Sequence, residues 1–330
     1  MKALLAATLL QVMLGSAFAQ AAPNCTPFDN GKANAPAQQP AFAGQTRACM
    51  APKSAPVTVT VLAKGLDHPW AAEPLPDGGV LVTERDGGSL RHVSAAGVLS
   101  KPIAGLPAVD ARGQGGLLDV ALSPTFATDR TIFWTYAEPR QGGNGTSVAR
   151  GVLSTDMLRL EQVRVILRTQ PTYDGDKHFG SRLAFGPDGM LYVTLGERSD
   201  LATRPQAQDL GSHLGKVLRI TADGAAPADN PFVGKPGARP EIWSWGHRNV
   251  QAAAFDGQGR LWTGEMGPRG GDELNLVERG KNYGWPTITY GIEYSGKPVG
   301  PGDTVRAGLE QPVYYWDPVI APSGAQWYSG

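Results

Sequence analysis

The stretch FGPDGMLYVTLGE (residues 185–197) decides the fold, because it joins a Pro-Asp-Gly turn to an apolar strand that ends on an acid. The same unit recurs as PDGGVLVTE (76–84) and FDGQGRLWTGE (255–265), with a weaker copy in LSPTFATDRTIFWTY (122–136). The copies are spaced by roughly 45 to 70 residues, the range of propeller blades with loop insertions. A β-sandwich is the alternative all-β architecture, but a recurring turn-plus-strand unit favours radial repetition. We therefore predict an all-β propeller.

The composition agrees with many short strands joined by tight turns. The 330 residues include 43 glycines and 27 prolines, with 41% hydrophobic and 18% charged side chains. The 30 basic and 30 acidic side chains cancel. Because nucleic acids and anionic membranes attract proteins with a basic excess, we expect neither as a partner.

The first 19 residues have the pattern of a secretory signal peptide. Lys2 precedes an apolar run over residues 3–14, and Ala17-Phe18-Ala19 forms an A-x-A cleavage site. The alternative is a membrane anchor, but the run is too short to span a bilayer, and no later segment is long and apolar enough to do so. We predict export to the periplasm or the medium.

Residues 20–55 form a Pro/Ala-rich leader without hydrophobic periodicity, and they contain the two cysteines of the chain, Cys25 and Cys49. In an exported protein this pair predicts one disulfide, with two free thiols as the alternative. The propeller domain is expected over residues 56–330. The chain stops after an aromatic strand with no closing segment, so we expect the final blade or the ring closure to be incomplete in this chain.

The common catalytic motifs G-x-S-x-G, H-E-x-x-H and G-x-x-x-x-G-K-[ST] are absent from the sequence. Among the five histidines, His178 stands out because it lies in the polar loop DGDKHFGSR (174–182), where an imidazole can act as a general base. Glu197, at the end of the following strand, is placed to orient it. The stretch 241–286 adds HRN (247–249) and a carboxylate- and carbonyl-rich loop. These groups predict a site for an anionic ligand together with a hard cation.

Five sequence blocks, in this order, resemble the soluble quinoprotein glucose/sorbosone dehydrogenase family, particularly its periplasmic aldose sugar dehydrogenase branch. They are GQGGLL (113–118), HFGSRL (178–183), GHRN (246–249), GPRGGDE (267–273) and NYGWP (282–286). The resemblance extends from Val57 to the chain end. It implies a six-bladed β-propeller that binds pyrroloquinoline quinone (PQQ) and calcium on one face.

The resemblance also implies roles for individual residues at the cofactor. Gln114 and Asn249 would hydrogen-bond PQQ. Arg248 would contact its quinone oxygens, and His178 would also contact the cofactor and would be the catalytic base. Glu197 matches the acid that supports this histidine. PQQ is a tricarboxylate ortho-quinone, so arginine donors and a hard cation suit it chemically.

For calcium, the resemblance implies main-chain carbonyl ligands from Gly267 and Pro268. Glu273 and Tyr283 match positions that we assign to calcium binding as well. Calcium prefers oxygen ligands of these kinds.

The predicted reaction is oxidation of an aldose sugar at C1 to the aldonolactone, with electrons passed to a soluble acceptor. Two alternatives stay open: a calcium-dependent lactonase-type propeller hydrolase and a non-catalytic propeller that serves as a binding scaffold. Two departures from the glucose-specific pattern leave the sugar open. Lys177 replaces an aspartate before the base, and Asp317-Pro318-Val319 replaces Trp-Pro-Thr.

Overall fold

The computed structural model describes residues 26–50 and 56–328, so the predicted signal peptide and Cys25 lie outside the described residues. Within this part of the chain the protein is built from fifteen β-strands, with one single-turn α-helix and one short 3-10 helix. The strands form one three-stranded and three four-stranded sheets, and all paired strands within a sheet are antiparallel. The all-β prediction is confirmed.

Each sheet is built from consecutive stretches of the chain. The first contains β1 (Pro69–Pro74), β2 (Val80–Glu84) and β3 (Ser89–Val93). The second contains β4 (Leu117–Leu122), β5 (Thr131–Arg140), β6 (Gly143–Leu153) and β7 (Leu160–Arg168). The third contains β8 (Leu183–Phe185), β9 (Leu191–Thr194), β10 (Lys216–Ile220) and β11 (Ile242–Trp245). The fourth contains β12 (Val250–Phe255), β13 (Leu261–Glu265), β14 (Asp272–Val277) and β15 (Tyr314–Trp316). The helices are α1 (Phe126–Asp129) and the 3-10 helix η1 (Arg204–Gln208).

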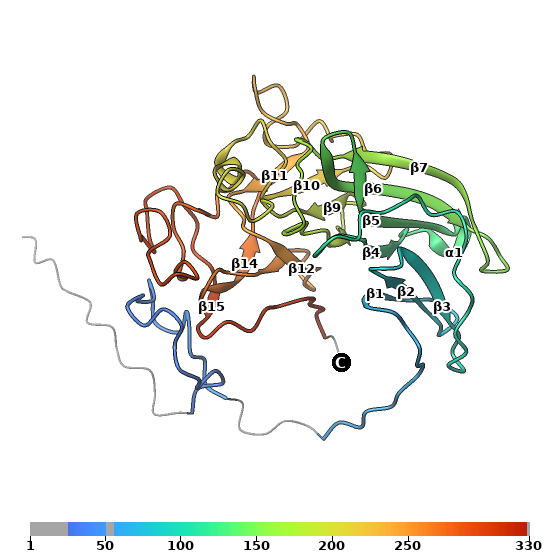
Figure 1. Ribbon diagram of the computed structural model, residues 1–330, viewed down its shortest axis with the longest axis horizontal. Helices are drawn as coiled ribbons and strands as arrows, with labels where there is room; N and C mark the ends of the chain where they lie inside the picture. Colours follow the sequence, from blue (N-terminus) through green and yellow to red (C-terminus); the bar gives the residue numbers. More distant parts are fainter. Residues whose placement is uncertain (1–25, 51–55, 329–330) are drawn as a thin grey trace, which may run out of the picture.

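The sheets are arranged as propeller blades (Figure 1). The first strand of each sheet is innermost: β1 packs against β4, β4 against β8 and β8 against β12. The predicted propeller is therefore confirmed, but the predicted number of six blades is wrong, because the described residues form four. The four blades with their long loops span residues 69–316 of the described chain.

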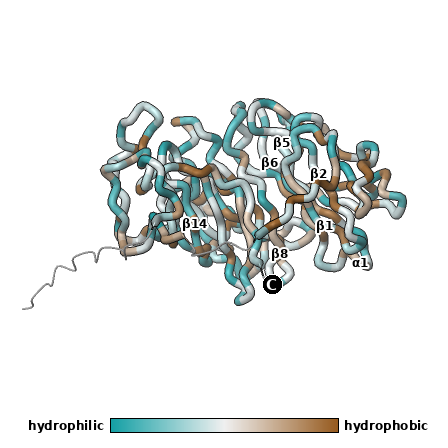
Figure 2. The backbone as a smooth tube through the Cα atoms, turned by 90° about the horizontal axis from the view of Figure 1, so that it is seen from below, coloured by the Kyte–Doolittle hydropathy of each residue, from teal (hydrophilic) through white to brown (hydrophobic). Residues whose placement is uncertain are grey.

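The core lies between neighbouring blades, where apolar side chains of facing strands meet. Leu81 and Leu90 of the first blade pack with Leu117 and Trp134 of the second in one cluster. Comparable clusters join the second blade to the third and the third to the fourth. Figure 2 shows hydrophobic residues along β1 and its neighbours, whereas many loops at the rim are hydrophilic. Burial of this apolar surface is the main favourable contribution to folding.

The recurring turn has the same structure in three of the four blades. The carboxylates of Asp77, Asp188 and Asp256 each accept a hydrogen bond from the main-chain N–H two residues further on, at 2.9, 3.0 and 2.9 Å. Gly78 and Gly189 follow two of these aspartates with φ of 84° and 74°, the left-handed region that favours glycine. The turn predicted from sequence thus precedes the second strand in these three blades.

Residues 26–50, part of the predicted leader, lie against the outer edge of the fourth blade beside β15 (Figure 1). Main-chain hydrogen bonds from Phe28 to Ala48 (2.7 Å) and from Met50 to Thr26 (2.9 Å) pair the two ends of this segment. Cys49 is disulfide-bonded. Among the described residues, no helix has the length and apolar character needed to cross a membrane.

Candidate active site

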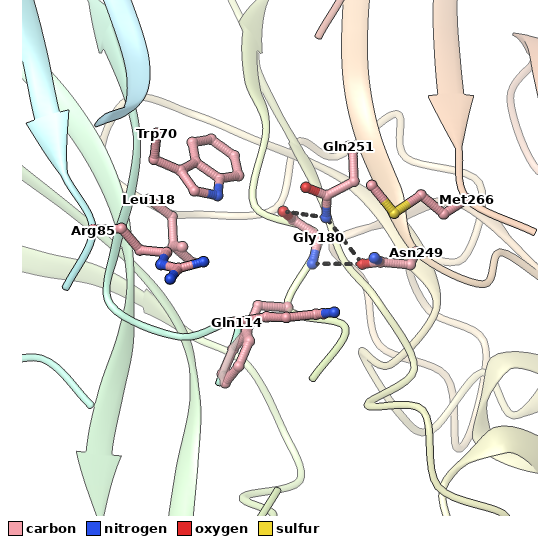
Figure 3. A pocket seen from close by; sticks show the side chains of 9 residues that line it. Trp70, Arg85, Gln114, Leu118, Gly180, Asn249, Gln251 and Met266 are labelled. Carbon is pink, nitrogen blue, oxygen red and sulfur yellow. Dashed lines mark hydrogen bonds between the residues drawn. The ribbon is translucent and has the colours of Figure 1, made fainter. Parts of the chain in front are cut away.

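A cavity of about 180 Å³ lies where residues from all four blades converge at one end of the inner strands (Figure 3). Two residues predicted to bind the cofactor, Gln114 and Asn249, line it. Trp70 and Arg85 come from the first blade, and Met266 comes from the fourth. The site therefore depends on the packing of the blades against one another.

Gln114 and Asn249 both hold the loop that carries His178. The Gln114 side-chain oxygen accepts a hydrogen bond from the His178 main-chain N–H at 2.8 Å. The Asn249 side-chain oxygen accepts hydrogen bonds from the main-chain N–H of Gly180 and the Gln251 amide, each at 3.1 Å (Figure 3). These oxygens are engaged by the protein, whereas the NH₂ groups of the two amides have no acceptor among residues 26–50 and 56–328 and are left as donors for a ligand.

The structure brings His178 and Glu197 together as predicted. His178 Nδ1 lies 2.7 Å from Glu197 Oε2, and the two residues are 6% and 0% exposed. The same carboxylate oxygen accepts the Ser199 N–H at 2.8 Å, which fixes its position. His178 has φ of 49°, so its backbone is held in the left-handed region. The pair has the arrangement of a general base oriented by an acid, with Nε2 left for the substrate.

Electrostatics keep this imidazole neutral near pH 7. Burial lowers the pKa of His178 below its ordinary value of 6.5, and Arg248 and Arg198 act in the same direction. The hydrogen bond and charge of Glu197 oppose them without reversing the shift. Burial alone would raise the pKa of Glu197, but the hydrogen bond from His178, the charge of Arg248 and the hydrogen bond from the Ser199 N–H bring that pKa below the ordinary 4.5. The site therefore pairs a neutral imidazole with a carboxylate.

Gly196 allows the close approach of the strands around this pair. A Cβ atom at Gly196 would lie 2.2 Å from the His178 carbonyl oxygen and 2.7 Å from Asn249 Oδ1. We expect Gly196→Ala to lower the free energy of unfolding by about 1–3 kcal/mol, because neither group can move without shifting the loop. Chemical denaturation measures this. Gly257→Ala is the matched control, since no atom lies within 4 Å of its Cβ position, and an equal loss there would contradict the prediction.

Arg248 is fixed at the edge of the predicted calcium loop. Its main-chain N–H donates to Glu265 Oε2 at 2.6 Å, and its Nη1 donates to the carbonyls of Met266 at 2.9 Å and Gly267 at 2.7 Å. The guanidinium carbon lies 5.3 Å from the centre of the Trp285 ring. Its Nε is buried and has no hydrogen-bond partner among the described residues. A buried donor without an acceptor calls for an explanation, and a ligand atom next to Arg248 would supply one.

Three of the four predicted calcium residues meet at one small cavity. Gly267, Glu273 and Tyr283 line a space of about 10 Å³ together with Arg248 and Glu265. This volume is close to that of one water-sized sphere. Burial, followed by the charge of Glu265, raises the pKa of Glu273 well above 4.5. A cation in this space would favour the ionised form of Glu273.

The surroundings of Tyr283 and Pro268 differ from those of the other two predicted calcium ligands. The Tyr283 hydroxyl donates to the Leu276 carbonyl at 2.5 Å and accepts the Glu278 N–H at 2.9 Å, so it is engaged by main chain. Pro268 is not among the residues that line the cavity. In the parts of the chain that the structure describes, no three His, Cys, Asp or Glu side chains form a metal-binding group. The predicted site accordingly depends on main-chain carbonyls as well as Glu273.

Sequence reasoning missed three arginine or aromatic residues around the site: Trp70, Arg85 and Arg198. Arg85 lines the cavity, and Trp70 lies opposite Asn249 (Figure 3). Arg198 donates to the carbonyls of Gly175 at 2.6 Å and Lys177 at 2.9 Å, on the loop that carries the base. The sequence contained a signal for the two arginines, because Arg85 and Arg198 both directly follow the acid that ends the recurring unit.

Comparisons with known proteins identify the family of this chain. The model of the glucose/sorbosone dehydrogenase family matches residues 66–330. The aldose sugar dehydrogenase YliI of Escherichia coli (strain K12) is 49% identical over 280 residues, which cover 83% of this chain and 74% of that protein.

Two solved structures are also similar. The soluble aldose sugar dehydrogenase of Escherichia coli in its apo form has a TM-score of 0.76 at 47% identity, covering 80% of this chain and 76% of that chain. The PQQ-bound aldose sugar dehydrogenase of Streptomyces coelicolor has a TM-score of 0.68 at 35% identity, covering 82% and 74%. With a family match over most of its length, this chain belongs to the glucose/sorbosone dehydrogenase family and is an oxidoreductase.

Proposed function

We propose that this protein oxidises aldose sugars at C1 to aldonolactones, with PQQ held by calcium as the bound electron acceptor and a soluble molecule as the final acceptor. The observation that carries this proposal is the buried pair of His178 and Glu197 at 2.7 Å, beside a cavity lined by Gln114 and Asn249. The PQQ-bound relative from Streptomyces coelicolor supports the choice of cofactor.

The described residues fit PQQ. The buried, unpartnered Nε of Arg248 supplies a donor for an oxygen of the cofactor. The NH₂ groups of Gln114 and Asn249 would supply two more, and the guanidinium of Arg85 adds positive charge at the same cavity. PQQ would supply a two-electron acceptor, which is chemistry that amino-acid side chains lack.

The described residues also fit a calcium ion. The carboxylates of Glu265 and Glu273 lie close enough for the charge of the first to raise the pKa of the second, which is unfavourable without a cation. The carbonyl of Gly267 and the carboxylate of Glu273 would be ligands, as oxygen donors suited to calcium. The positive charge of the ion would also attract the carboxylates of PQQ.

His178 would act as the base. Its Nε2 would take the proton from the anomeric hydroxyl of the sugar as the C1 hydrogen leaves with its electron pair. Glu197 would stabilise the imidazolium that forms and keep the Nδ1–H directed away from the substrate. Because burial keeps the imidazole neutral at pH 7, the base is ready to accept a proton.

We place the protein in the periplasm or outside the cell. This part of the proposal depends on the signal-like residues 1–19 and on the disulfide at Cys49, a bond that persists in oxidising compartments.

The test is reconstitution of purified metal-free protein with PQQ and calcium, followed by dye reduction with several aldoses. We expect sugar-dependent reduction only when both additions are present. Hydrolysis of lactones without a quinone would replace the proposal with a lactonase. Absence of both activities and of PQQ binding would leave a propeller that serves as a binding scaffold.

A further inference from the structure

We propose that residues 26–50 act as a brace that holds the loop of residues 267–272 in place. We call residues 26–50 the N-terminal brace. It lies outside residues 66–330, which the family model matches. Its effect on calcium and PQQ rests on the proposed function, but the mechanical support itself does not.

The brace docks through a buried and fully engaged side chain, Gln45, which is 0% exposed. Its main-chain carbonyl accepts the Tyr315 N–H at 2.8 Å, so the brace bonds to the outer strand of the fourth blade. Its side-chain amide donates to the Pro312 carbonyl at 2.9 Å and accepts the Tyr290 hydroxyl at 3.0 Å. A buried residue with partners at Tyr290 and on the tract of residues 312–315 fixes one docked position, because any shift would leave polar groups unpaired.

The N-terminal brace binds the tract of residues 316–321, and it contacts both the side chain and the main chain of Asp317. The Asp317 carboxylate, 5% exposed, accepts the main-chain N–H groups of Asn34 at 2.5 Å and Ala35 at 3.0 Å. Arg47 donates to the main-chain carbonyl of Asp317 and, within the brace, to the carbonyls of Asp29 at 2.6 Å and Gly31 at 2.9 Å. Arg47 therefore ties the brace to itself and to the end of the fourth blade.

The tract of residues 316–321 in turn makes hydrogen bonds to the loop of residues 267–272. The Trp316 carbonyl accepts the Gly271 N–H at 3.0 Å. The Asp272 carboxylate accepts the N–H groups of residues 320–321 through one oxygen, each at 2.7 Å, and the Gly267 N–H through the other at 2.8 Å. The loop is thus bonded to residues 316–321 at its C-terminal end, through Gly271 and Asp272, and the Asp272 carboxylate links that end to Gly267 at the start of the loop.

The brace also reaches the loop directly at Gly270. A Cβ atom at this glycine would lie 3.3 Å from the Ala35 Cβ and 3.2 Å from Asp317 Oδ1. Gly270 and Gly271 have φ of 87° and 72°, so this loop uses two consecutive residues with large conformational freedom in the unfolded chain. A glycine-rich loop of this kind has little local stability, and its order depends on contacts from outside.

Hydrogen exchange of the full chain, without metal or PQQ, tests the proposal. In Arg47→Met we expect the amides of Gly267 and Gly271 to exchange roughly tenfold faster than in the wild type, because the charge-assisted hydrogen bond to the Asp317 carbonyl and the two that hold the brace together are lost. Arg306→Met is the matched control. Arg306 pairs with Asp303 at 2.6 Å in a half-exposed ion pair, and its loss should leave both amides unchanged.

A milder variant keeps the test decisive if Arg47→Met folds poorly. Asn34→Ala removes the side-chain amide, whose oxygen accepts the Val319 N–H at 3.0 Å, and it should speed exchange at the same two amides by a smaller factor. Faster exchange within the brace with unchanged exchange at Gly267 and Gly271 would overturn the proposal, and the brace would be a cover for the outer strand. Because no cofactor is present, this outcome is independent of any failure to reduce dye.

Discussion

His178→Ala is expected to lower the rate of sugar oxidation by roughly 10²–10⁴-fold, the usual contribution of a positioned general base. The variant removes the imidazole whose Nδ1 lies 2.7 Å from Glu197 Oε2 and whose Nε2 would take the substrate proton. PQQ binding should change little, because Gln114 and Asn249 make their contacts to this loop through main-chain groups of His178 and Gly180. Steady-state kinetics of the reconstituted protein measure the loss.

His213→Ala is the control for effects on stability. His213 is also buried, at 3% exposed, and faces a carboxylate, with Nε2 3.3 Å from Glu241 Oε2. Burial lowers its pKa as it does for His178. The two variants should therefore destabilise the fold to a similar degree, while only His178→Ala loses the rate. Equal rates in the two variants would remove His178 from the reaction.

The pH dependence of the wild type follows from the same pair. Since burial places the pKa of His178 below 6.5, the acid limb of kcat/KM should lie below pH 6.5. Between the pKa of His178 in the folded protein and pH 6.5, the unfolded state binds more protons than the folded state. The stabilising contribution of the neutral, buried imidazole is therefore complete above pH 6.5 and is lost as the pH falls through this range. An acid limb above pH 7 would contradict this assignment.

The number of blades agrees with the number of repeats in the sequence and not with the number implied by the family resemblance. The four recurring units over 76–84, 122–136, 185–197 and 255–265 correspond to the four blades, one unit in each. The expectation of six came from the resemblance. Turns and strands follow local rules, such as an aspartate that accepts the N–H two residues on, so the sequence predicts them without knowledge of the fold.

The candidate site was predictable in part for a related reason. His178 and Glu197 lie 19 residues apart, on the loop before β8 and just after β9, so the hairpin brings them together. The docking of Gln45 on Tyr290, 245 residues away, has no such signal, because buried polar contacts between distant segments follow no period. The sequence likewise gives no signal for the hydrogen bonds between the Tyr283 hydroxyl and the main chain of Leu276 and Glu278.

Arg248→Lys is the second change with a large expected effect, and it should weaken PQQ binding by roughly 10- to 100-fold. A lysine keeps the charge and can still donate to the Gly267 carbonyl, but it has no counterpart of the buried Nε that lacks a partner in the described chain. It also loses the planar group that faces Trp285 at 5.3 Å. Titration of metal-loaded protein with PQQ, followed by absorbance, measures the affinity.

Arg204→Lys is a closely matched control for this change. Arg204 lies over the same ring of Trp285 at 5.2 Å, also has a buried Nε without a described partner, and pairs with Glu293. It does not line the small cavity beside Gly267, so its replacement should leave the PQQ affinity within a factor of about 2, as is usual for a change that touches no ligand. Equal losses in both variants would mean that Arg248 acts through the packing of Trp285. A selective loss in Arg248→Lys, with an unchanged unfolding midpoint, would assign the unpaired Nε to the cofactor.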